Sequence, residues 1–286
     1  MRRLRDYSWA DWRRLRPLGH AYKTAIYRTF TAWHVRRRSP GIASIVNEVR
    51  TRNQTTLAVT IAFEAPWAIR HQVAAARRQF KDAMLVVCDN SRNEDAAHEI
   101  EAICREAGVA YLRLPVDPSK KGSRSHAMAI NWVYRNLVCA VTPSCFAFLD
   151  HDLFPTKPVF FAALIEHQPI YGLMRTAAHR WYLWAGFCVF DGRYAAAPVL
   201  DFSQDWFNGL DTGGGNYHLL YNSLDRAAMV FATLRTEERH DPITGVRMAV
   251  DFVDDWLHVK NVSGWDADRK LDPKLIERVV RSEIGH

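Results

Sequence analysis

The chain of 286 residues alternates between short apolar runs and longer amphipathic stretches over its first half. Apolar runs of strand length, rich in branched and aromatic side chains, lie at 57–63, 83–88, 109–114 and 146–149. Stretches with helical periodicity separate them at 67–80, 94–107 and 126–137. Strands that alternate with helices in this way predict a parallel sheet with right-handed crossovers. We therefore expect an α/β fold with a mostly parallel central sheet flanked by helices.

The second half of the chain has a looser pattern. Aromatic-rich strands are predicted at 171–175 and 181–190, a glycine-rich loop at 211–216, and a polar closing helix at 272–284. We expect three regions: a basic helical extension at 1–45, a main domain at 46–265 and a C-terminal helix or tail at 266–286. Within the main domain, 57–158 has the pattern of a nucleotide-binding half, and 159–265 forms a more irregular acceptor half.

Most of the net charge of +7 belongs to the N-terminal segment. Residues 1–40 hold eleven Arg or Lys and two Asp, so the rest of the chain is slightly acidic. Tyr22, Ile26, Phe30 and Trp33 recur there at helical spacing. A basic helix with an aromatic stripe is typical of binding to an anionic membrane surface. Docking of the stripe on the protein's own core is an open alternative, and nucleic acid is the least favoured partner.

The composition also bears on location. No apolar run reaches the roughly 18 residues of a membrane-spanning helix, and the N-terminus lacks the apolar core of a secretory signal. The five cysteines have no C-x-x-C spacing, which favours free buried thiols in a reducing compartment over disulfides or zinc. We expect a cytoplasmic protein that binds peripherally, through residues 1–38, to the inner face of the cell membrane.

Two carboxylates, Asp150 and Asp152, directly follow the apolar run 146–149. Residues two apart in a strand point to the same side, so both side chains face one way at the strand's carboxyl end. Open α/β sheets bind ligands at that edge. Carboxylate oxygens are the ligands that Mg²⁺ and Mn²⁺ prefer, and both ions complete their shells with phosphate oxygens and water. The pair therefore favours a metal–diphosphate site, and a solvated acidic turn is the alternative.

The order of the motifs resembles that of the GT-A fold glycosyltransferases, particularly the inverting enzymes of the family 2 type. The first strand ends in Phe63-Glu64, and the second strand is followed by Asp89-Asn90-Ser91. A loop then leads into a helix with the sequence Ser-His-Ala-Met-Ala-Ile-Asn, at 125–131, and the fourth strand ends in Asp-x-Asp. The resemblance extends from about residue 57 to residue 265. It implies a GT-A (Rossmann-like) domain.

This resemblance implies nucleotide contacts for Phe63, Glu64, Asp89, Arg124, Asp150 and His151. Phe63 falls where an aromatic ring packs on the base, and Asp89 falls where an acid accepts a hydrogen bond from it. Arg124 stands beside a helix N-terminus, a place suited to a phosphate. Asp150 would face the ribose, while His151 would point elsewhere or touch the sugar.

The resemblance further implies a metal set of Asp150, Asp152 and His258, with Mn²⁺ or Mg²⁺ as the cofactor. Asp152 would hold the metal through the diphosphate. His258 matches, in its order along the chain, a late histidine that several such enzymes use as an additional ligand. Trp184 and Gly186 lie in an aromatic run that suits the wall of a sugar or acceptor site, because aromatic rings stack on sugars.

Transfer of a sugar to a hydroxyl requires a base that removes the hydroxyl proton. Asp211 is the expected base, since the glycines beside it permit close approach of the backbone to a ligand. Asp205, Asp254 and Asp255 are the reserve candidates. The Glu-Asp pair usual in this family is missing from the glycine-rich loop, which is a departure from the family's pattern.

The resulting prediction is a metal-dependent glycosyltransferase that acts with inversion. The donor is a nucleotide sugar, with a UDP-sugar favoured, and the acceptor is a glycan or a glycolipid. One alternative is an inactive GT-A-like relative that serves as a binding or scaffold protein at a membrane. Another is a sugar-1-phosphate nucleotidyltransferase, although residues 63–66 lack the glycine-rich signature of that class.

Overall fold

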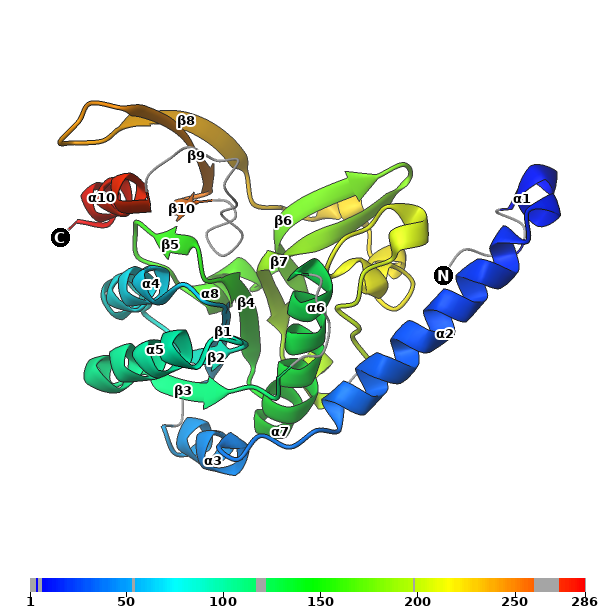
Figure 1. Ribbon diagram of the computed structural model, residues 1–286, viewed down its shortest axis with the longest axis horizontal. Coiled ribbons are helices and arrows are strands. Elements are labelled where there is room, and N and C mark those ends of the chain that lie inside the picture. The colour runs from blue at the N-terminus through cyan, green and yellow to red at the C-terminus, as the bar shows by residue number, and fades with distance from the viewer. Residues whose placement is uncertain are drawn as a thin grey trace.

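The computed structural model describes residues 4, 7–52, 55–116, 122–197, 199–259 and 273–285. Its centre is a six-stranded sheet in the order β3-β2-β1-β4-β7-β6 (Figure 1). The strands are β1 (Thr56–Ala62), β2 (Ala83–Asp89), β3 (Ala110–Arg113), β4 (Cys145–Asp150), β6 (Ile170–Ala177) and β7 (Arg180–Asp191). Strands β1 to β4 run parallel, whereas β7 pairs antiparallel with both β4 and β6. The mostly parallel central sheet expected from the sequence is confirmed.

Helices cover both faces of this sheet, as predicted. They are α3 (Ile42–Thr51), α4 (Pro66–Gln79), α5 (Glu94–Ala107), α6 (Gly122–Val133) and the short α7 (Cys139–Val141). Successive residues of β1 point to opposite faces. Val59 belongs to the apolar cluster that includes α3 and α6, whereas Ala58 belongs to the cluster that includes α4 and α5. Strand β1 is buried along its whole length, as expected for a parallel strand covered on both faces.

The elements predicted between residues 57 and 150 are confirmed, and the boundaries follow local signals. Helix α5 spans the predicted range because Asn93 caps its first amides and Gly108 ends it in the left-handed conformation (φ 67°). The helix predicted at 126–137 begins earlier, at Gly122, and passes after Val133 into a π-helical turn, Tyr134–Val138.

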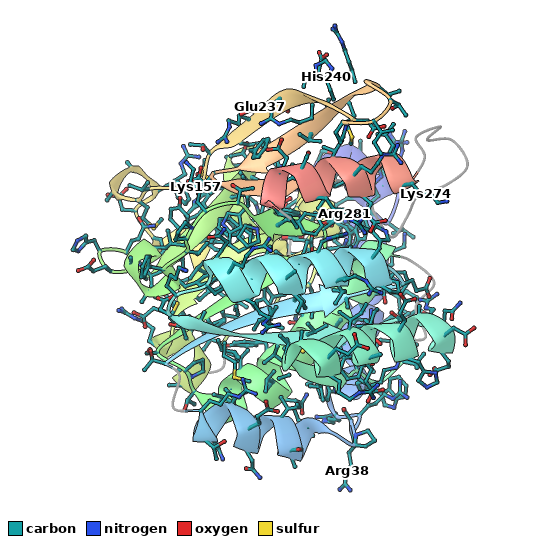
Figure 2. All side chains as sticks on the ribbon, turned by 90° about the vertical axis from the view of Figure 1, so that its left-hand side faces the viewer. Arg38, Lys157, Glu237, His240, Lys274 and Arg281 are labelled. Atoms are coloured by element: carbon teal, nitrogen blue, oxygen red, sulfur yellow. The ribbon has the colours of Figure 1, made fainter. Side chains whose placement is uncertain are left out.

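A second, antiparallel sheet was not predicted. It has the order β5-β10-β9-β8, with β5 (Leu153–Pro155), β8 (Leu234–His240), β9 (Arg247–Val253) and β10 (Trp256–His258). The closing helix α10 (Pro273–Ile284) is amphipathic rather than polar, because Leu275, Val279 and Val280 are buried. Figure 2 shows α10 beside α4, with the β8–β9 hairpin on its other side. The sequence did not predict this sheet in part because two of its four strands have only three residues each, too few to show a strand's alternation of apolar and polar residues.

Between β5 and β8 the chain also forms short elements joined by irregular segments. These are α8 (Phe161–Leu164), α9 (Arg193–Ala196) and the 3₁₀ turns Trp206–Asn208, Gly214–Tyr217, Tyr221–Ser223 and Arg226–Ala228. A buried polar network ties this region to α6. The amide of Asn131 donates to Asp201 and Ser203, and its oxygen accepts from the backbone of Phe202.

The N-terminal extension is helical, as predicted. Helix α2 (Arg16–Val35) runs outward from beside α6, and α1 (Trp9–Arg13) lies at its far end (Figure 1). Among the described residues, no helix is both long enough and apolar enough to cross a membrane. All five cysteines are free. The predicted domain boundary at residue 45 falls within α3, the boundary at residue 265 lies outside the described residues, and the division stays a prediction.

Candidate metal centre

Three metal-ligating side chains meet at the carboxyl edge of the central sheet. Asp150 is the last residue of β4, Asp152 lies in the turn that follows, and His258 is the last residue of β10. One ligand atom from each lies within 4.8 Å of the other two. Nε2 of His258 is 3.6 Å from Oδ1 of Asp152. The structure thus brings together the three residues that the sequence predicted as metal ligands.

The second sheet explains how a histidine so late in the chain reaches this edge. Strand β10 pairs antiparallel with β5, and the register places His258 opposite Leu153, the residue after Asp152. The amide of Val259 donates to the carbonyl of Asp152 at 3.0 Å, which extends the pairing past the strand. His258 and Asp152 are buried, whereas Asp150 is half-buried. The site therefore has one open side, toward Asp150.

The donor set fits a hard divalent cation. Two carboxylates and one imidazole suit Mn²⁺, and Mg²⁺ accepts the same oxygens. Gly186 of β7 adds independent support, because a Cβ at this position would overlap Oδ2 of Asp150 and the ring of Trp184. The ring centroid of Trp184 lies 4.8 Å from that of His258. Gly186 and Trp184, predicted for the sugar or acceptor site, thus lie directly beside the candidate ligands.

Two further residues hold the Asp150–Asp152 turn, and neither was among the predicted site residues. Nε2 of His126, on α6, is 3.3 Å from Oδ1 of Asp150. The side-chain amide of Gln72, on α4, donates to the carbonyls of Asp150 at 2.7 Å and Leu153 at 3.0 Å. His126 stands in the 125–131 segment quoted for the family resemblance, but only the fold shows that its ring faces Asp150.

His151 points away from its two neighbours. Its Nδ1 donates to the carbonyl of Ile61 on β1 at 3.1 Å. Burial lowers the pKa of the imidazole, which favours the neutral ring despite the nearby Asp150 carboxylate. The expectation that His151 faces elsewhere agrees with this geometry, and its contact with a sugar stays a prediction.

Two of the predicted nucleotide-binding residues, Asp89 and Glu64, support one loop. The carboxylate of Asp89 is fully buried and accepts from the Ser91 amide, the Tyr111 hydroxyl and the Arg113 guanidinium, at 2.8–3.1 Å. Glu64 accepts from the backbone amides of Arg92 and Asn93, so it holds the same loop from the other side.

Asp89 accepts these three hydrogen bonds within the protein, whereas the exposed Glu64 accepts its two at Oε1. Phe63 follows β1 and is half-buried. The roles of these three residues toward a nucleotide stay predictions.

Arg124 is directed toward the N-terminal extension. Its guanidinium carbon lies 5.1 Å from the ring centroid of Tyr27 on α2, within the range of a cation–π contact. Its predicted contact with a phosphate stays a prediction. Lys121, in the same segment, lies outside the described residues.

Asp211 is exposed and accepts from the side-chain amide of Gln204 at 2.6 Å. Its loop packs closely on β7, because a Cβ at Gly213 (φ 94°) would lie 2.7 Å from the carbonyl oxygen of Leu183. The loop therefore contacts the strand that carries Trp184 and Gly186. The role of Asp211 as the base stays a prediction.

The three reserve candidates for the base have partners elsewhere. Asp205 is buried with Arg180 at 3.4 Å, Asp254 accepts from the Tyr171 hydroxyl at 2.6 Å, and Asp255 pairs with Lys157 at 2.9 Å. These contacts make all three less available than Asp211 for proton transfer.

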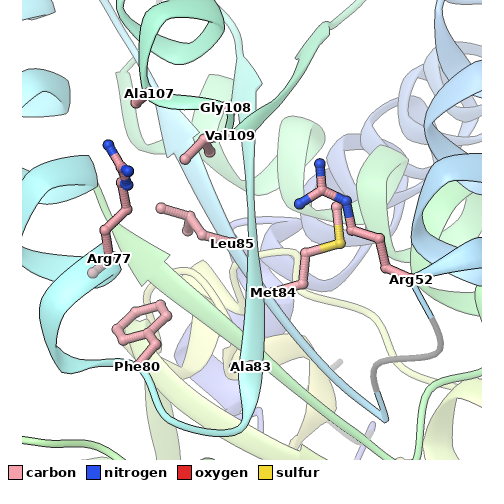
Figure 3. A pocket seen from close by; sticks show the side chains of 10 residues that line it. Arg52, Arg77, Phe80, Ala83, Met84, Leu85, Ala107, Gly108 and Val109 are labelled. Atoms are coloured by element: carbon pink, nitrogen blue, oxygen red, sulfur yellow. The ribbon is translucent and has the colours of Figure 1, made fainter.

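A separate hollow of about 210 Å³ lies at the opposite end of β2, where the strand begins (Figure 3). Its lining includes Arg52, Arg77, Phe80, Met84 and Val109, and none of the described residues that line it carries a carboxylate or an imidazole. It therefore lacks the donors of the Asp150–Asp152–His258 site and is not part of it.

No family model matches the sequence, and no curated protein matches it. Several solved structures are similar. Glucosyl-3-phosphoglycerate synthase from Mycobacterium tuberculosis, in complex with Mn²⁺, UDP and glucosyl-3-phosphoglycerate, is 15% identical with a TM-score of 0.39, over 68% of this chain and 74% of that one. The bifunctional glycosyltransferase WbbM is 10% identical with a TM-score of 0.35, over 51% of this chain. TarS of S. aureus is 13% identical with a TM-score of 0.37, over 52% of this chain and 30% of that one.

This chain spans 33% of the length of WbbM. Glycosyltransferases are thus among the solved structures to which the chain is similar. At these identities and TM-scores, the similarity concerns the arrangement of sheet and helices and assigns no substrate.

Proposed function

We propose that the protein is a metal-dependent glycosyltransferase that moves a sugar from a nucleotide-sugar donor to a hydroxyl acceptor. One observation carries the proposal: the ligand atoms of Asp150, Asp152 and His258 lie within 4.8 Å of one another at the carboxyl edge of a parallel sheet. That edge is where open α/β folds bind nucleotides. A divalent cation held there would neutralise charge on a departing diphosphate.

The chain's own residues then have separable tasks. Asp152 and His258, which are buried, would hold the ion together with the half-buried Asp150, which would face the donor. His126 orients the Asp150 carboxylate from α6. The ring of Trp184, packed beside His258, offers a face for the donor sugar.

Asp211 removes the proton of the acceptor hydroxyl, and attack from the face opposite the leaving group inverts the anomeric centre. Support for this role is the contact of its loop with β7 and the engagement of Asp205, Asp254 and Asp255 in other pairs.

The favoured donor is a UDP-sugar, and the acceptor is a glycan or a glycolipid. In the same proposal, the basic N-terminal segment holds the protein peripherally on the inner face of the cell membrane. The family resemblance supports the donor and acceptor classes, and the charge of residues 1–40 supports the membrane position.

Calorimetric titration of UDP in the presence and absence of Mn²⁺ tests the metal-dependent site. We expect UDP to bind the wild-type protein only with Mn²⁺, and Asp152→Ala to lose that binding while its circular dichroism spectrum is unchanged. Asp255→Ala removes a half-exposed acid from the turn before β10 and serves as the control. Undiminished Mn²⁺-dependent binding by Asp152→Ala would refute the proposal.

A panel of nucleotide sugars with Mn²⁺ separates the enzyme from an inactive scaffold. Release of the nucleoside diphosphate from any donor excludes the scaffold. If no donor in the panel turns over although UDP binds with Mn²⁺, the transferase activity is refuted and the binding function stands.

A further inference from the structure

Helix α2 packs on the protein with its polar side inward and its apolar side outward. The inward positions, which are buried or half-buried, are Pro17, His20, Thr24, Tyr27, Thr31 and His34. The opposite side carries Leu18, Tyr22, Ile26, Phe30 and Trp33, which are 61%, 67%, 39%, 51% and 49% exposed. We call these five residues the outer stripe. A helix on a soluble domain ordinarily presents the reverse arrangement.

The inward side is firmly attached, so the outward direction of the stripe is fixed by packing. The ring of His20 stacks on Phe207 of the acceptor half with centroids 3.8 Å apart. Tyr27 lies under the guanidinium of Arg124 on α6. At the end of the helix, the side-chain amide of Asn136 donates to the carbonyl of Val35 at 3.0 Å. These contacts rule out docking of the stripe on the protein's own core.

The charges around the outer stripe are positive apart from Asp11, which pairs with Arg16 at 2.7 Å before the stripe begins. Residues 12–47 contain no Asp or Glu, and they contain Arg13, Arg14, Arg16, Lys23, Arg28, Arg36, Arg37 and Arg38. Lys23 and Arg28 are exposed along the middle of the helix, and Arg37 lies over the ring of Trp33 at 5.1 Å from its centroid. The stripe is therefore an apolar surface with a cationic border.

This combination selects among partners. A second copy of the chain docked through the same stripe would bring two cationic borders together, which costs free energy. Nucleic acid is bound by basic side chains on the contact face itself, whereas here the contact face is apolar. An anionic bilayer satisfies both features, because its acyl region accepts the apolar side chains and its headgroups attract the border.

We propose that the outer stripe of α2 inserts into the interfacial layer of an anionic membrane, with the flanking Arg and Lys side chains at the headgroups. This deepens the membrane attachment in the proposed function by assigning it to one face of one helix. The polar side of α2 keeps its contacts with Phe207 and α6, so the acceptor half lies directly beside the bound membrane.

Sedimentation of the full chain with vesicles tests the assignment. We expect binding to phosphatidylcholine vesicles that contain about one third phosphatidylglycerol, and weak binding to pure phosphatidylcholine. The triple variant Tyr22→Ser, Ile26→Ser, Phe30→Ser should bind about tenfold more weakly for each side chain removed, since each loses its apolar transfer. Lys23→Gln and Arg28→Gln should each weaken binding about fivefold, and this loss should vanish at high salt.

A matched control removes exposed apolar side chains elsewhere. Leu219, Val230 and Ile243 are 52%, 68% and 77% exposed, and their replacement by Ser should leave vesicle binding unchanged. Equal binding by the stripe variant and the wild type would overturn the inference. The inference would also be overturned if the wild type bound duplex DNA but not vesicles. It would likewise be overturned if the wild type formed a dimer and bound no vesicles, and the stripe variant were a monomer.

Vesicle binding is measured without a sugar donor, so its failure leaves the Mn²⁺-dependent site and the proposed transferase activity untouched. Conversely, loss of UDP binding in Asp152→Ala does not affect the membrane assignment. The two experiments therefore fail independently.

Discussion

The two sheets of this protein contribute to one site in different ways. The central sheet delivers Asp150 as the last residue of β4 and Asp152 in the turn that directly follows that strand. The second sheet delivers His258 through a three-residue strand that pairs with β5 immediately after the two acids. The central sheet is buried between helices, whereas β8 of the second sheet is mostly exposed. The comparison shows that the larger sheet sets the location of the site and the smaller sheet completes its ligands.

Removal of the ligand from the second sheet is expected to have the largest effect. His258→Ala should weaken Mn²⁺ binding about 100-fold. Loss of a residue that only hydrogen-bonds a metal ligand costs about 10- to 100-fold in metal affinity, so loss of a ligand should reach the upper end of that range. Titration followed by the electron paramagnetic resonance of free Mn²⁺ measures this directly. His240→Ala, at the exposed end of β8, is the control from the same sheet. If both variants bind Mn²⁺ as the wild type does, the second sheet supplies no ligand.

Gly186→Ala tests the contribution of the central sheet without replacing a ligand residue. The new methyl group would overlap the Asp150 carboxylate and the Trp184 ring, so one of them must move. We expect a loss of Mn²⁺ affinity of about 10- to 100-fold, comparable to the loss of a residue that hydrogen-bonds a metal ligand. Gly19→Ala, at a position with open space around the added Cβ, should bind Mn²⁺ normally. Normal affinity in Gly186→Ala would show that its methyl group is accommodated away from the ligands.

His126 tests whether α6 orients the open side of the site. His126→Ala removes the imidazole that lies 3.3 Å from Asp150, and we expect about a tenfold loss of Mn²⁺-dependent UDP affinity. His126→Gln keeps a donor and should restore part of the affinity, which a purely structural role would not explain. His98→Ala, on the exposed side of α5, is the control. Equal Mn²⁺-dependent UDP affinity in His126→Ala and the wild type would show that His126 does not contribute to the site.

Much of the central sheet is predictable from the sequence because its signals are local. The strands at 57–63 and 83–88 are continuous apolar runs, and Asn93 and Gly108 mark the ends of a helix with side-chain and backbone chemistry of their own. The Asp150–Asp152 pair was recognised from its place directly after the fourth apolar run. Strand alternation, on which its common direction was predicted, does not reach Asp152, because β4 ends at Asp150 and Asp152 lies in the following turn.

The remainder depends on contacts between distant residues. The three residues of β10 have no period that a sequence can display, and β8 reads Leu-Arg-Thr-Glu-Glu-Arg-His, which suggests solvent rather than a sheet. His126 and Gln72 become site residues only because α6 and α4 pack beside β4. The outer stripe of α2 was visible in the sequence, but periodicity alone does not tell whether a stripe faces the core or solvent.

The smallest expected effect on the site comes from the far edge of the second sheet. Arg278 of α10 binds the buried Asp241 through two hydrogen bonds of 2.7 Å, and this pairing holds the pKa of Asp241 well below its usual value of 3.8. A carboxyl with a lowered pKa in the folded state stabilises the fold above pH 3.8. That contribution is lost as the pH falls below 3.8, because the unfolded chain then binds the proton more readily.

Arg278→Met should therefore lower the melting temperature at pH 7 and reduce the loss of stability between pH 4 and pH 2. Its Mn²⁺ affinity at pH 7 should stay within about twofold of the wild type, because distant sites act independently. Arg281→Met, one turn along α10 and exposed, is the control. A large loss of Mn²⁺ affinity in Arg278→Met would show that the whole second sheet, and not only β10, is needed to hold His258. The part of the second sheet that the metal site needs would then include the β8–β9 hairpin as well as the β5–β10 pair.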